Sequence, residues 1–377
     1  MNRVMLGMYC KIQGGFAFKS DQFINNGIPI IRIGNIQNGS VTVDKDVCYH
    51  EEFIDNQKNK SFIILKGDIL IAMSGATVGK LGIYNAEYVA LLNQRVGKFV
   101  CSTKLNKKYI YYLLSYDLYQ KQIFNIATGC AQPNISTSQL ESIMIPYYES
   151  KDQEKIVQEL DKINDAIANR KNSVNLCNEL LECMFDKFVN SNKYENIRLG
   201  DLLEKVSNIK NQNTQIHYID ISSIDKDKNE IVEYKDYNLL DAPSRARQVV
   251  YKDDILFSLV RPNLKNIAKV TFNIDNLICS TGFVVMRANA KALPDYIYRM
   301  VISKEFTEKM INKTVGATYP ALNIGEVLNE KIKLISIPKQ KEIVDIITII
   351  ENQKNLLEQD IKDLLQLLEI KQYEYFK

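Results

Sequence analysis

The sequence offers little from which a catalytic centre could be built. It contains only two histidines, His50 and His217, and nothing marks a Ser-His-Asp or Cys-His arrangement around either. No His and Cys residues have the spacing of metal ligands, and no GxGxxG follows a predicted strand. The (Asn or Asp)-Pro-Pro-aromatic signature of amino-methyltransferases is also missing. These absences predict a chain that does not methylate or cut a substrate by itself.

Paired cysteines and long apolar runs are missing too. The seven cysteines are scattered, odd in number and without a CxxC pair: Cys10, Cys48, Cys101, Cys130, Cys177, Cys183 and Cys279. We therefore expect reduced thiols in a cytoplasmic protein. The first residues hold no apolar core long enough for a signal peptide, and no stretch approaches ~18 consecutive apolar residues. We expect no membrane span.

The charge balance favours no single class of partner. There are 48 basic and 45 acidic side chains, giving a net charge of +3. A protein that covers nucleic acid alone usually has a stronger basic bias. The near-neutral total fits a subunit that touches nucleic acid locally while a partner supplies other contacts, and it fits an ordinary soluble protein equally well. The length of 377 residues, with 46% hydrophobic residues, predicts two folded domains.

An internal repeat determines the predicted architecture. Residues 66–71 (KGDILI) match 252–257 (KDDILF) at an offset of 186. Residues 128–135 (TGCAQPNI) match 315–322 (VGATYPAL), and 153–157 (QEKIV) match 340–344 (QKEIV), both at an offset of 187. Three ordered matches at offsets of 186 or 187 indicate two similar halves, each a globular unit followed by a helix.

The predicted fold class is α+β. Short apolar runs broken by Gly, Asn and Asp, together with helical patterns over 107–124 and 294–312, predict two mixed α/β domains, residues 1–148 and 194–337. Two long helices are predicted at 149–193 and 338–377. We expect them to pair as an antiparallel intramolecular coiled coil, with an approximate two-fold axis relating the halves.

The helices are predicted from apolar residues spaced alternately four and three apart, which is typical of a narrow coiled-coil seam. The seam comprises Ile156, Leu160, Ile163, Ile167, Val174, Cys177, Leu181, Met184 and Phe188 in the first helix and Ile343, Ile347, Ile350, Leu357, Ile361, Leu364, Leu368 and Tyr375 in the second. Arg170, Lys354 and Lys371 interrupt it. The alternatives are that each helix packs on its own domain, or that two chains pair.

One segment looks like a phosphate-binding loop but departs from that pattern. Residues 74–81 (SGATVGKL) have three residues between the glycines where a nucleotide hydrolase has four. Leu81 stands where a Ser or Thr would hold magnesium, and the matching stretch 259–265 (LVRPNLK) has no glycine. The plain interpretation is a tight turn between strands. The functional one is a turn that presents Thr77 and Lys80 to a phosphate backbone.

Several polar clusters have the residue types that read base edges in a DNA groove. Those in the first half are Lys19, Ser20, Arg32, Asn35, Asn93, Gln94, Arg95, Gln132 and Asn134. Those in the second half are Arg245, Arg247, Arg261, Asn263, Lys265, Ser280, Thr281 and Tyr319. The alternative for each residue is a structural role, as a helix cap or a brace within a turn.

The order of these strings resembles the specificity (S) subunit of Type I restriction-modification systems. In the first half the strings are residues 14–20 (GGFAFKS), 27–36 (GIPIIRIGNI), 67–70 (GDIL), 74–80 (SGATVGK), 92–96 (LNQRV), 131–136 (AQPNIS) and 153–156 (QEKI). The second half matches more loosely, with 199–201 (LGD), 218–222 (YIDIS), 243–247 (PSRAR), 254–256 (DIL), 261–263 (RPN) and 280–283 (STGF). It lacks the glycine-rich turn and the Asn-Gln-Arg string, so we expect the two domains to read different sequences.

The resemblance implies a role and a set of partners. Each domain would be a target-recognition domain that reads one half of a split site in double-stranded DNA, and the helices would set the gap. Two methyltransferase subunits would dock on the helices and bring S-adenosylmethionine. Restriction subunits that use ATP and magnesium would join in some complexes. The chain itself would hold no cofactor and no metal.

Three other interpretations stay open at this point. One is the recognition subunit of a related Type II system, which sequence alone separates poorly from Type I. Another is a coiled-coil adaptor that binds proteins and no DNA. A third is an NTPase or hydrolase, against which stand the defective loop at 74–81 and the missing nucleophile and base.

Overall fold

The computed structural model describes residues 2–37, 39–128, 133–210, 214–314 and 320–377. The chain divides into two compact units. Unit 1 comprises Met1–Lys171 and Gln359–Lys377, and unit 2 comprises Asn172–Glu358. Each unit therefore combines one globular domain with one half of each long helix, whereas the boundaries predicted from the sequence separate helices from domains.

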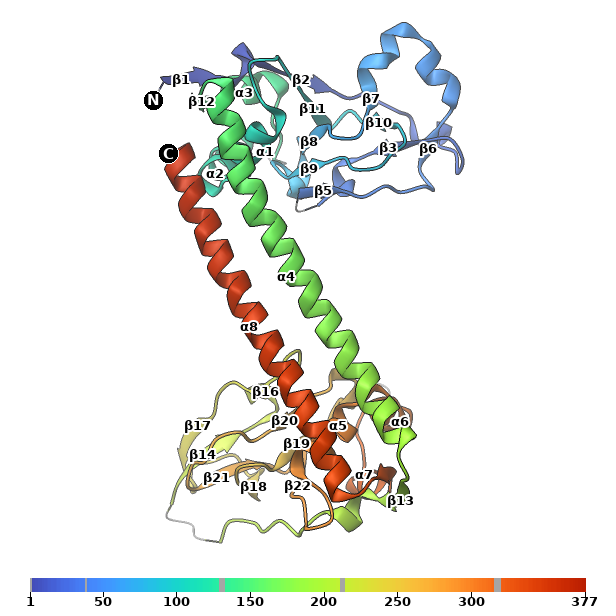
Figure 1. Cartoon of the computed structure of the whole chain (residues 1–377), viewed down its shortest axis with the longest axis vertical. Helices are drawn as coiled ribbons and strands as arrows, with labels where there is room; N and C mark the ends of the chain where they lie inside the picture. The colour runs from blue at the N-terminus through green and yellow to red at the C-terminus, as the bar shows by residue number, and fades with distance from the viewer. Residues whose placement is uncertain (1, 38, 129–132, 211–213, 315–319) are drawn as a thin grey trace. The chain divides into compact units, whose positions relative to one another are not determined.

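Unit 1 contains sheets of six, four and two strands (Figure 1). Their orders are β2-β11-β8-β9-β5-β4, β6-β3-β10-β7 and β1-β12. Strands β3 and β10 run parallel, and so do β5 and β9. The strands span β1 Asn2–Met5, β2 Cys10–Gly14, β3 Ile28–Ile31, β4 Ile36–Gln37, β5 Gly39–Val41, β6 Cys48–Tyr49, β7 Ile63–Ile64, β8 Ile69–Ala72, β9 Leu81–Ile83, β10 Ala90–Leu92, β11 Val96–Cys101 and β12 Met144–Tyr147.

One apolar core joins the six-stranded sheet of unit 1 to a set of helices. They are α1 Lys107–Ser115, α2 Asp117–Ala127, α3 Thr137–Glu141, the first part of α4 Ser150–Ser191 and the last part of α8 Ile337–Phe376. Strand β8 is buried over its whole length because its residues, ILIA, are apolar on both faces. Ile69 and Ile71 belong to the core against the helices, whereas Leu70 and Ala72 belong to the core of the opposite side.

Unit 2 repeats this plan, but sheets of three and two strands stand in place of the six-stranded sheet. Their orders are β17-β14-β21-β18, β20-β19-β22, β13-β23 and β15-β16. The strands span β13 Glu195–Arg198, β14 Gln215–Ile219, β15 Ile224–Asp225, β16 Glu230–Ile231, β17 Lys235–Asn238, β18 Ala246–Val249, β19 Ile255–Ser258, β20 Ile267–Lys269, β21 Leu277–Ser280, β22 Phe283–Met286 and β23 Lys331–Leu334. The helices are α5 Pro294–Ile302, α6 Lys304–Asn312, α7 Ile324–Leu328 and the adjoining parts of α4 and α8.

The sequence repeat corresponds to a repeat of contacts within each unit. The parallel pair of β3 with β10 recurs as β14 with β21, and the antiparallel pair of β1 with β12 recurs as β13 with β23. The aspartate that the matched strings 66–71 and 252–257 share accepts the same kind of backbone hydrogen bond in both units. Asp68 accepts a hydrogen bond from the backbone N–H of Leu65 at 3.0 Å, and Asp254 accepts one from Tyr251 at 2.8 Å. The short helices α3 and α7 both begin with a capping box.

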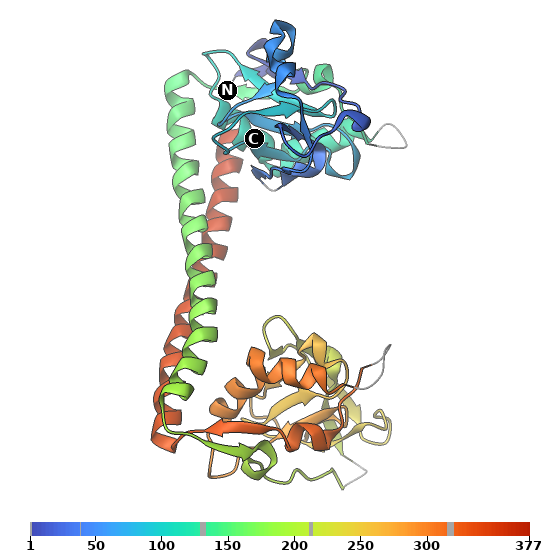
Figure 2. The same ribbon diagram turned by 90° about the vertical axis from the view of Figure 1, so that its right-hand side faces the viewer.

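The two long helices run antiparallel within each unit. In unit 1, Lys371 of α8 pairs with Glu159 of α4 at 3.1 Å, and Asp360 pairs with Arg170 at 3.5 Å. Residue numbers thus rise along α4 as they fall along α8, and both views show the helices side by side there (Figures 1 and 2). In unit 2, the later part of α4 shares one apolar cluster with the first turns of α8. The predicted α+β fold with a long antiparallel helix pair is confirmed.

Burial along the seam is deepest in the first turns of each long helix. Ile156, Leu160, Ile163 and Ile167 are buried on α4, and Ile343 and Ile347 are buried on α8. The remaining seam residues are half-buried: Val174, Cys177, Leu181, Met184 and Phe188 on α4, and Ile350, Leu357, Ile361, Leu364, Leu368 and Tyr375 on α8. On the unit 2 part of α4 the buried residues are Phe185 and Val189, which the heptad pattern did not include. Both lie one position after a seam residue, because this face of α4 packs with Tyr296 and Ile335 as well as with α8.

Candidate nucleic-acid interface

Three loops of unit 1 are joined by backbone hydrogen bonds where β8 ends and β11 begins. The N–H of Met73 donates to the carbonyl of Arg95 at 2.9 Å, and the N–H of Ile135 donates to Met73 at 2.9 Å. The N–H of Gly75 donates to the carbonyl of Pro133 at 2.9 Å. Residues 73–80, 93–95 and 133–135 therefore form one surface, although 60 positions of sequence separate the first and last of them.

The glycine string at 14–16 joins the same surface by close backbone approach. A Cβ atom at Gly15 would lie 2.1 Å from the carbonyl oxygen of Asn93, so no other residue fits there. The N–H of Phe16 donates to Leu92 at 2.8 Å. The N–H of Asn93 donates to the carbonyl of Ile31 at 3.2 Å, which places the neighbouring Arg32 at the same end of the parallel strands β3 and β10.

The structure separates the predicted residues of unit 1 into exposed and inward-facing ones. The exposed ones are Lys19, Ser20, Arg32, Lys80, Gln94, Arg95 and Asn134. Asn93 is half-buried. Asn35 is buried, and its side chain accepts a hydrogen bond from the backbone N–H of Arg32 at 2.9 Å, as a cap does. The Thr77 hydroxyl oxygen is buried and has no partner within the described residues. Gln132 lies outside the described residues.

Unit 2 builds its loop surface with the same backbone bonds. The N–H of Leu259 donates to Gly282 at 2.9 Å, and the N–H of Leu322 donates to Leu259 at 2.8 Å. The N–H of Arg261 donates to the carbonyl of Pro320 at 2.8 Å. Each bond is one of unit 1 displaced by 186 or 187 positions at both ends. The two domains therefore hold loops of different sequence on equivalent frames.

Most predicted residues of unit 2 point outward: Arg245, Arg247, Arg261, Asn263, Lys265 and Thr281 are exposed. Arg261 and Lys265 bracket a short turn, and both have a left-handed backbone, with φ of 48° and 52°. This conformation is uncommon outside glycine and marks a tightly constrained turn. Ser280 is buried, and its hydroxyl accepts a hydrogen bond from the N–H of Gly282 at 3.1 Å. Tyr319 lies outside the described residues.

An open groove of about 760 Å³ crosses the loop surface of unit 2. Its polar lining residues are Asn208, Gln248, Thr281, Asn323 and Glu326. Only Thr281 among them was predicted. Gln248 directly follows the string 243–247, and its neighbour Arg247 is one of the predicted base-edge candidates. Asn208 and Asn323 carry no sequence signal, because the fold brings them to the groove from distant positions.

Comparison with known proteins identifies the family. The Type I restriction modification DNA specificity domain matches residues 2–176 and again residues 191–367. The chain belongs to this family. The family predicted from the motifs is therefore confirmed. The two matched ranges agree with the repeated strand pairs and hydrogen bonds of the two units.

Two specificity subunits are similar in sequence to part of this specificity-domain protein. The Type I restriction enzyme MjaVIII specificity subunit of Methanocaldococcus jannaschii is 30% identical over 161 residues, which cover 41% of this chain and 37% of the relative. The HindI specificity subunit of Haemophilus influenzae is 29% identical over 176 residues, covering 45% and 38%. The chain thus spans less than two fifths of either relative's length.

A solved structure shares the fold over the full length of the chain. The Type I restriction-modification system S subunit from M. genitalium aligns with 100% of this chain and 96% of its own, with a TM-score of 0.61 and 16% identity. At this identity the likeness concerns the fold alone. No described helix combines the length and the hydropathy of a membrane span. Within the same residues, no group of three or more His, Cys, Asp or Glu side chains is placed to hold a metal ion.

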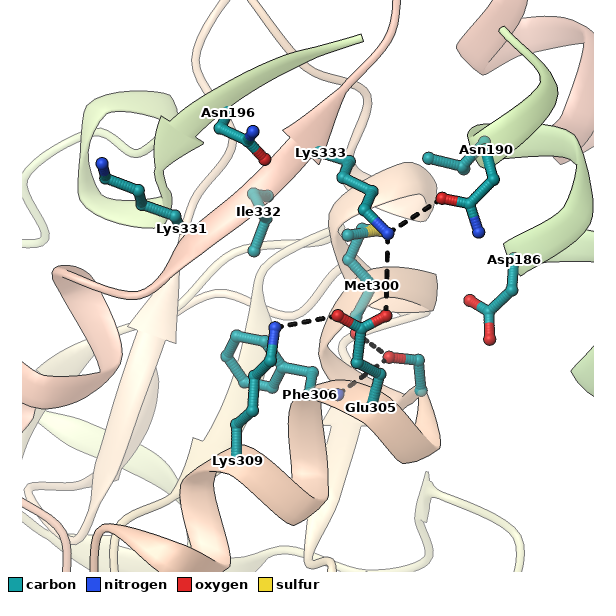
Figure 3. A pocket seen from close by; sticks show the side chains of 12 residues that line it. Asp186, Asn190, Asn196, Met300, Glu305, Phe306, Lys309, Lys331, Ile332 and Lys333 are labelled. Carbon is teal, nitrogen blue, oxygen red and sulfur yellow. Dashed lines mark hydrogen bonds and ion pairs between the residues drawn. The ribbon is translucent and has the colours of Figure 1, made fainter.

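A second hollow in unit 2 of this specificity-domain protein serves packing (Figure 3). It measures about 70 Å³ and lies where the end of α4 meets α6 and β23. Lys333 donates to Asn190 at 2.8 Å and approaches Glu305 at 3.9 Å, and Lys309 pairs with Glu305 at 2.8 Å. Burial raises the pKa of Asp186, Glu305 raises it further, and Lys333 opposes them. The polar contacts that line this hollow brace the end of α4.

Proposed function

We propose that this chain is the DNA-recognition subunit of a Type I restriction-modification complex. The observation that carries the proposal is the duplicated loop surface, which presents amide, hydroxyl and guanidinium groups on two equivalent frames within a DNA specificity family. Such groups form the hydrogen bonds that distinguish base edges in the major groove. Lysines around them, such as Lys80 and Lys265, are suited to phosphate contacts that fix the register.

Each domain would read one half of a bipartite site. The frames are equivalent but the side chains differ: unit 1 offers Asn93, Gln94 and Arg95 where unit 2 offers Ser280, Thr281 and Gly282. Different groups on one frame select different bases, so the two halves of the site should differ. The continuous helix α4 joins the domains along the chain, and we assign the fixed gap between the half-sites to the helix pair.

Protein partners would supply the chemistry. Large apolar side chains off the seam are exposed on the long helices, among them Leu176 at 64%, Ile349 at 68% and Leu356 at 64%. Exposed apolar groups of this kind are typical of surfaces that bind other proteins. We assign the helices to docking of two methyltransferase subunits, which would bring S-adenosylmethionine. Restriction subunits with ATP and magnesium would join the same assembly, and the chain itself is assigned no catalytic step.

The test is to co-express this chain with the methyltransferase gene that neighbours it and to map adenine methylation across the host DNA by single-molecule sequencing. The control is the methyltransferase without this chain. The proposal predicts a split motif with two fixed halves and a constant gap that appears only when both proteins are present. An assembled, folded complex that leaves no motif would contradict DNA recognition and would favour a protein-binding adaptor.

A further inference from the structure

The side chain of Gln248 is fixed at the floor of the unit 2 groove. Its Nε2 atom donates to the carbonyl of Ser280 at 2.9 Å and to the carbonyl of Phe283 at 3.0 Å, with a longer contact to Cys279 Sγ at 3.8 Å. A glutamine amide carries two N–H donors, so both are engaged. The reverse orientation would place Oε1 against two carbonyl oxygens, so these contacts determine which atom faces outward.

The remaining atom of that amide, Oε1, is available to a ligand. It accepts no hydrogen bond from any residue that the structure describes, and it is not buried: Thr77 is the one described residue with a buried side-chain atom that lacks a partner. Because Gln248 lines the groove, Oε1 is an acceptor held open to it. A rigid acceptor pays little entropy on binding, and it discriminates against other acceptors by electrostatic repulsion.

A bulge in β18 orients this side chain. Ala246 pairs with Ser280 and Gln248 pairs with Cys279, so the register shifts between them. On the other side, the N–H of Ile209 donates to Arg247 at 2.9 Å and the N–H of Val249 donates to Ser207 at 3.0 Å. The bulged strand is therefore held from both edges. Bulges commonly redirect a side chain toward a binding site.

We propose that Gln248 Oε1 determines specificity by accepting a hydrogen bond from an exocyclic amino group, adenine N6 or cytosine N4, in the half-site read by unit 2. The inference rests on the proposed function. In the major groove, adenine and cytosine present amino donors, whereas guanine O6 and thymine O4 are acceptors and would face Oε1 unfavourably. Asn208 and Thr281 line the same groove and extend its polar surface.

Unit 1 has no equivalent group at this place. The strand pairing shows which positions of the two units correspond. In unit 2, Val249 pairs with Ile278 of β21, and in unit 1, Ile63 pairs with Leu91 of β10. The residue before Ile63 is Phe62, whose ring packs against Phe16 with centroids 5.5 Å apart. An aromatic pair thus stands where unit 2 has a polar acceptor. This difference predicts that recognition of an amino group by such an acceptor is confined to the half-site read by unit 2.

The first experiment maps the motif of the Gln248→Met complex, assembled with its methyltransferase subunits, against wild type. Methionine keeps the length of the side chain and removes the amide. We expect one base position of the unit 2 half-site to lose about tenfold in discrimination, while the other half and the gap stay unchanged. Gln215→Met is the matched control, because Gln215 is exposed on β14 of the same domain and away from the groove lining, and its motif should equal wild type.

A second measurement starts from the wild-type complex and so does not rest on the variant alone. Wild-type complex is bound to duplexes in which single adenines or cytosines of that half-site lack the amino group. We expect one such position to weaken binding about tenfold in wild type and to have no effect in Gln248→Met. An unchanged motif in Gln248→Met, or an amino deletion that affects both proteins equally at every position, would overturn the inference and leave DNA recognition intact. A wild-type complex without any split motif would instead overturn the proposed function.

Discussion

The side chain of Gln153, in the first turn of α4, accepts a hydrogen bond from the backbone N–H of Asn106 at 2.8 Å. Its Nε2 donates to the carbonyls of Lys104 and Tyr148 at 3.0 and 2.7 Å. Gln340, in the first turn of α8, repeats the arrangement with Leu293 at 2.8 Å, and both glutamines are fully buried. Each amide thereby attaches a long helix to the domain that precedes it, which explains why the repeat retains this residue.

Replacing either glutamine should destabilise the protein. Gln153→Ala leaves buried backbone groups without partners, and we expect the free energy of unfolding to fall by about 2–3 kcal/mol, with the same result for Gln340→Ala. Gln158→Ala is the matched control because that side chain is exposed on α4, and it should change stability by less than about 0.5 kcal/mol. Chemical denaturation measures the difference. Equal stability of Gln153→Ala and Gln158→Ala would contradict the attachment.

The seam predicts opposite outcomes for adjacent leucines. Leu364 is half-buried in the seam, whereas Leu365 is 46% exposed. Leu364→Lys places a charge between the helices and should lower the unfolding free energy by about 2 kcal/mol, whereas Leu365→Lys should be close to neutral. Leu181→Lys and Leu180→Lys form the equivalent pair on α4, since Leu180 is 45% exposed. Unchanged melting curves for Leu364→Lys and Leu181→Lys would refute the seam.

Stability should depend on pH through Asp186. Its folded pKa is raised above the ordinary 3.8, chiefly by burial, so the charged carboxylate destabilises the folded state at neutral pH. Asp186→Asn removes this penalty, and we expect a gain below about 1 kcal/mol at pH 7, because the partly exposed carboxyl is screened by solvent. The gain should vanish as pH falls through the folded pKa toward 3.8. A gain that persists in acid would contradict the cause assigned to it.

Exposed lysines on the loop surfaces should contribute to affinity without changing the motif. Lys80→Ala removes a charge suited to a phosphate contact, and we expect weaker DNA binding with a salt-dependence slope reduced by about one. Binding titrations at several salt concentrations measure the slope. The mapped motif should remain that of wild type. A changed motif with an unchanged slope would assign Lys80 to base reading instead.

The repeat and the helical periodicity were sufficient to predict the fold class. Both are properties of the linear sequence: Gln153 and Gln340 stand 187 positions apart, and Leu160 and Ile347 follow the four-three spacing. Side-chain direction in the loops could not be predicted in this way. Asn35 and Ser280 have residue types suited to base edges, yet their side chains turn inward to bond the backbone.

The groove of unit 2 could not be predicted from the sequence for a different reason. Asn208 and Gln248 are 40 positions apart and carry no motif, and they meet only because an isolated bridge pairs them beside the bulge in β18. Phe185 and Val189 were missed similarly, since the seam pattern describes contacts between helices, whereas these side chains also pack with Tyr296 and Ile335 of the domain. Contacts that depend on the tertiary fold have no periodic signature.

The most direct test of the account exchanges residues 1–148 for the matching domain of a relative and maps methylation by the chimeric complex. If each domain recognises its half-site independently, one half of the motif changes to that of the donor, while the other half stays fixed. The half that stays fixed is then the one assigned to unit 2. A chimera that alters both halves, or neither, would contradict the claim that each domain reads its own half-site.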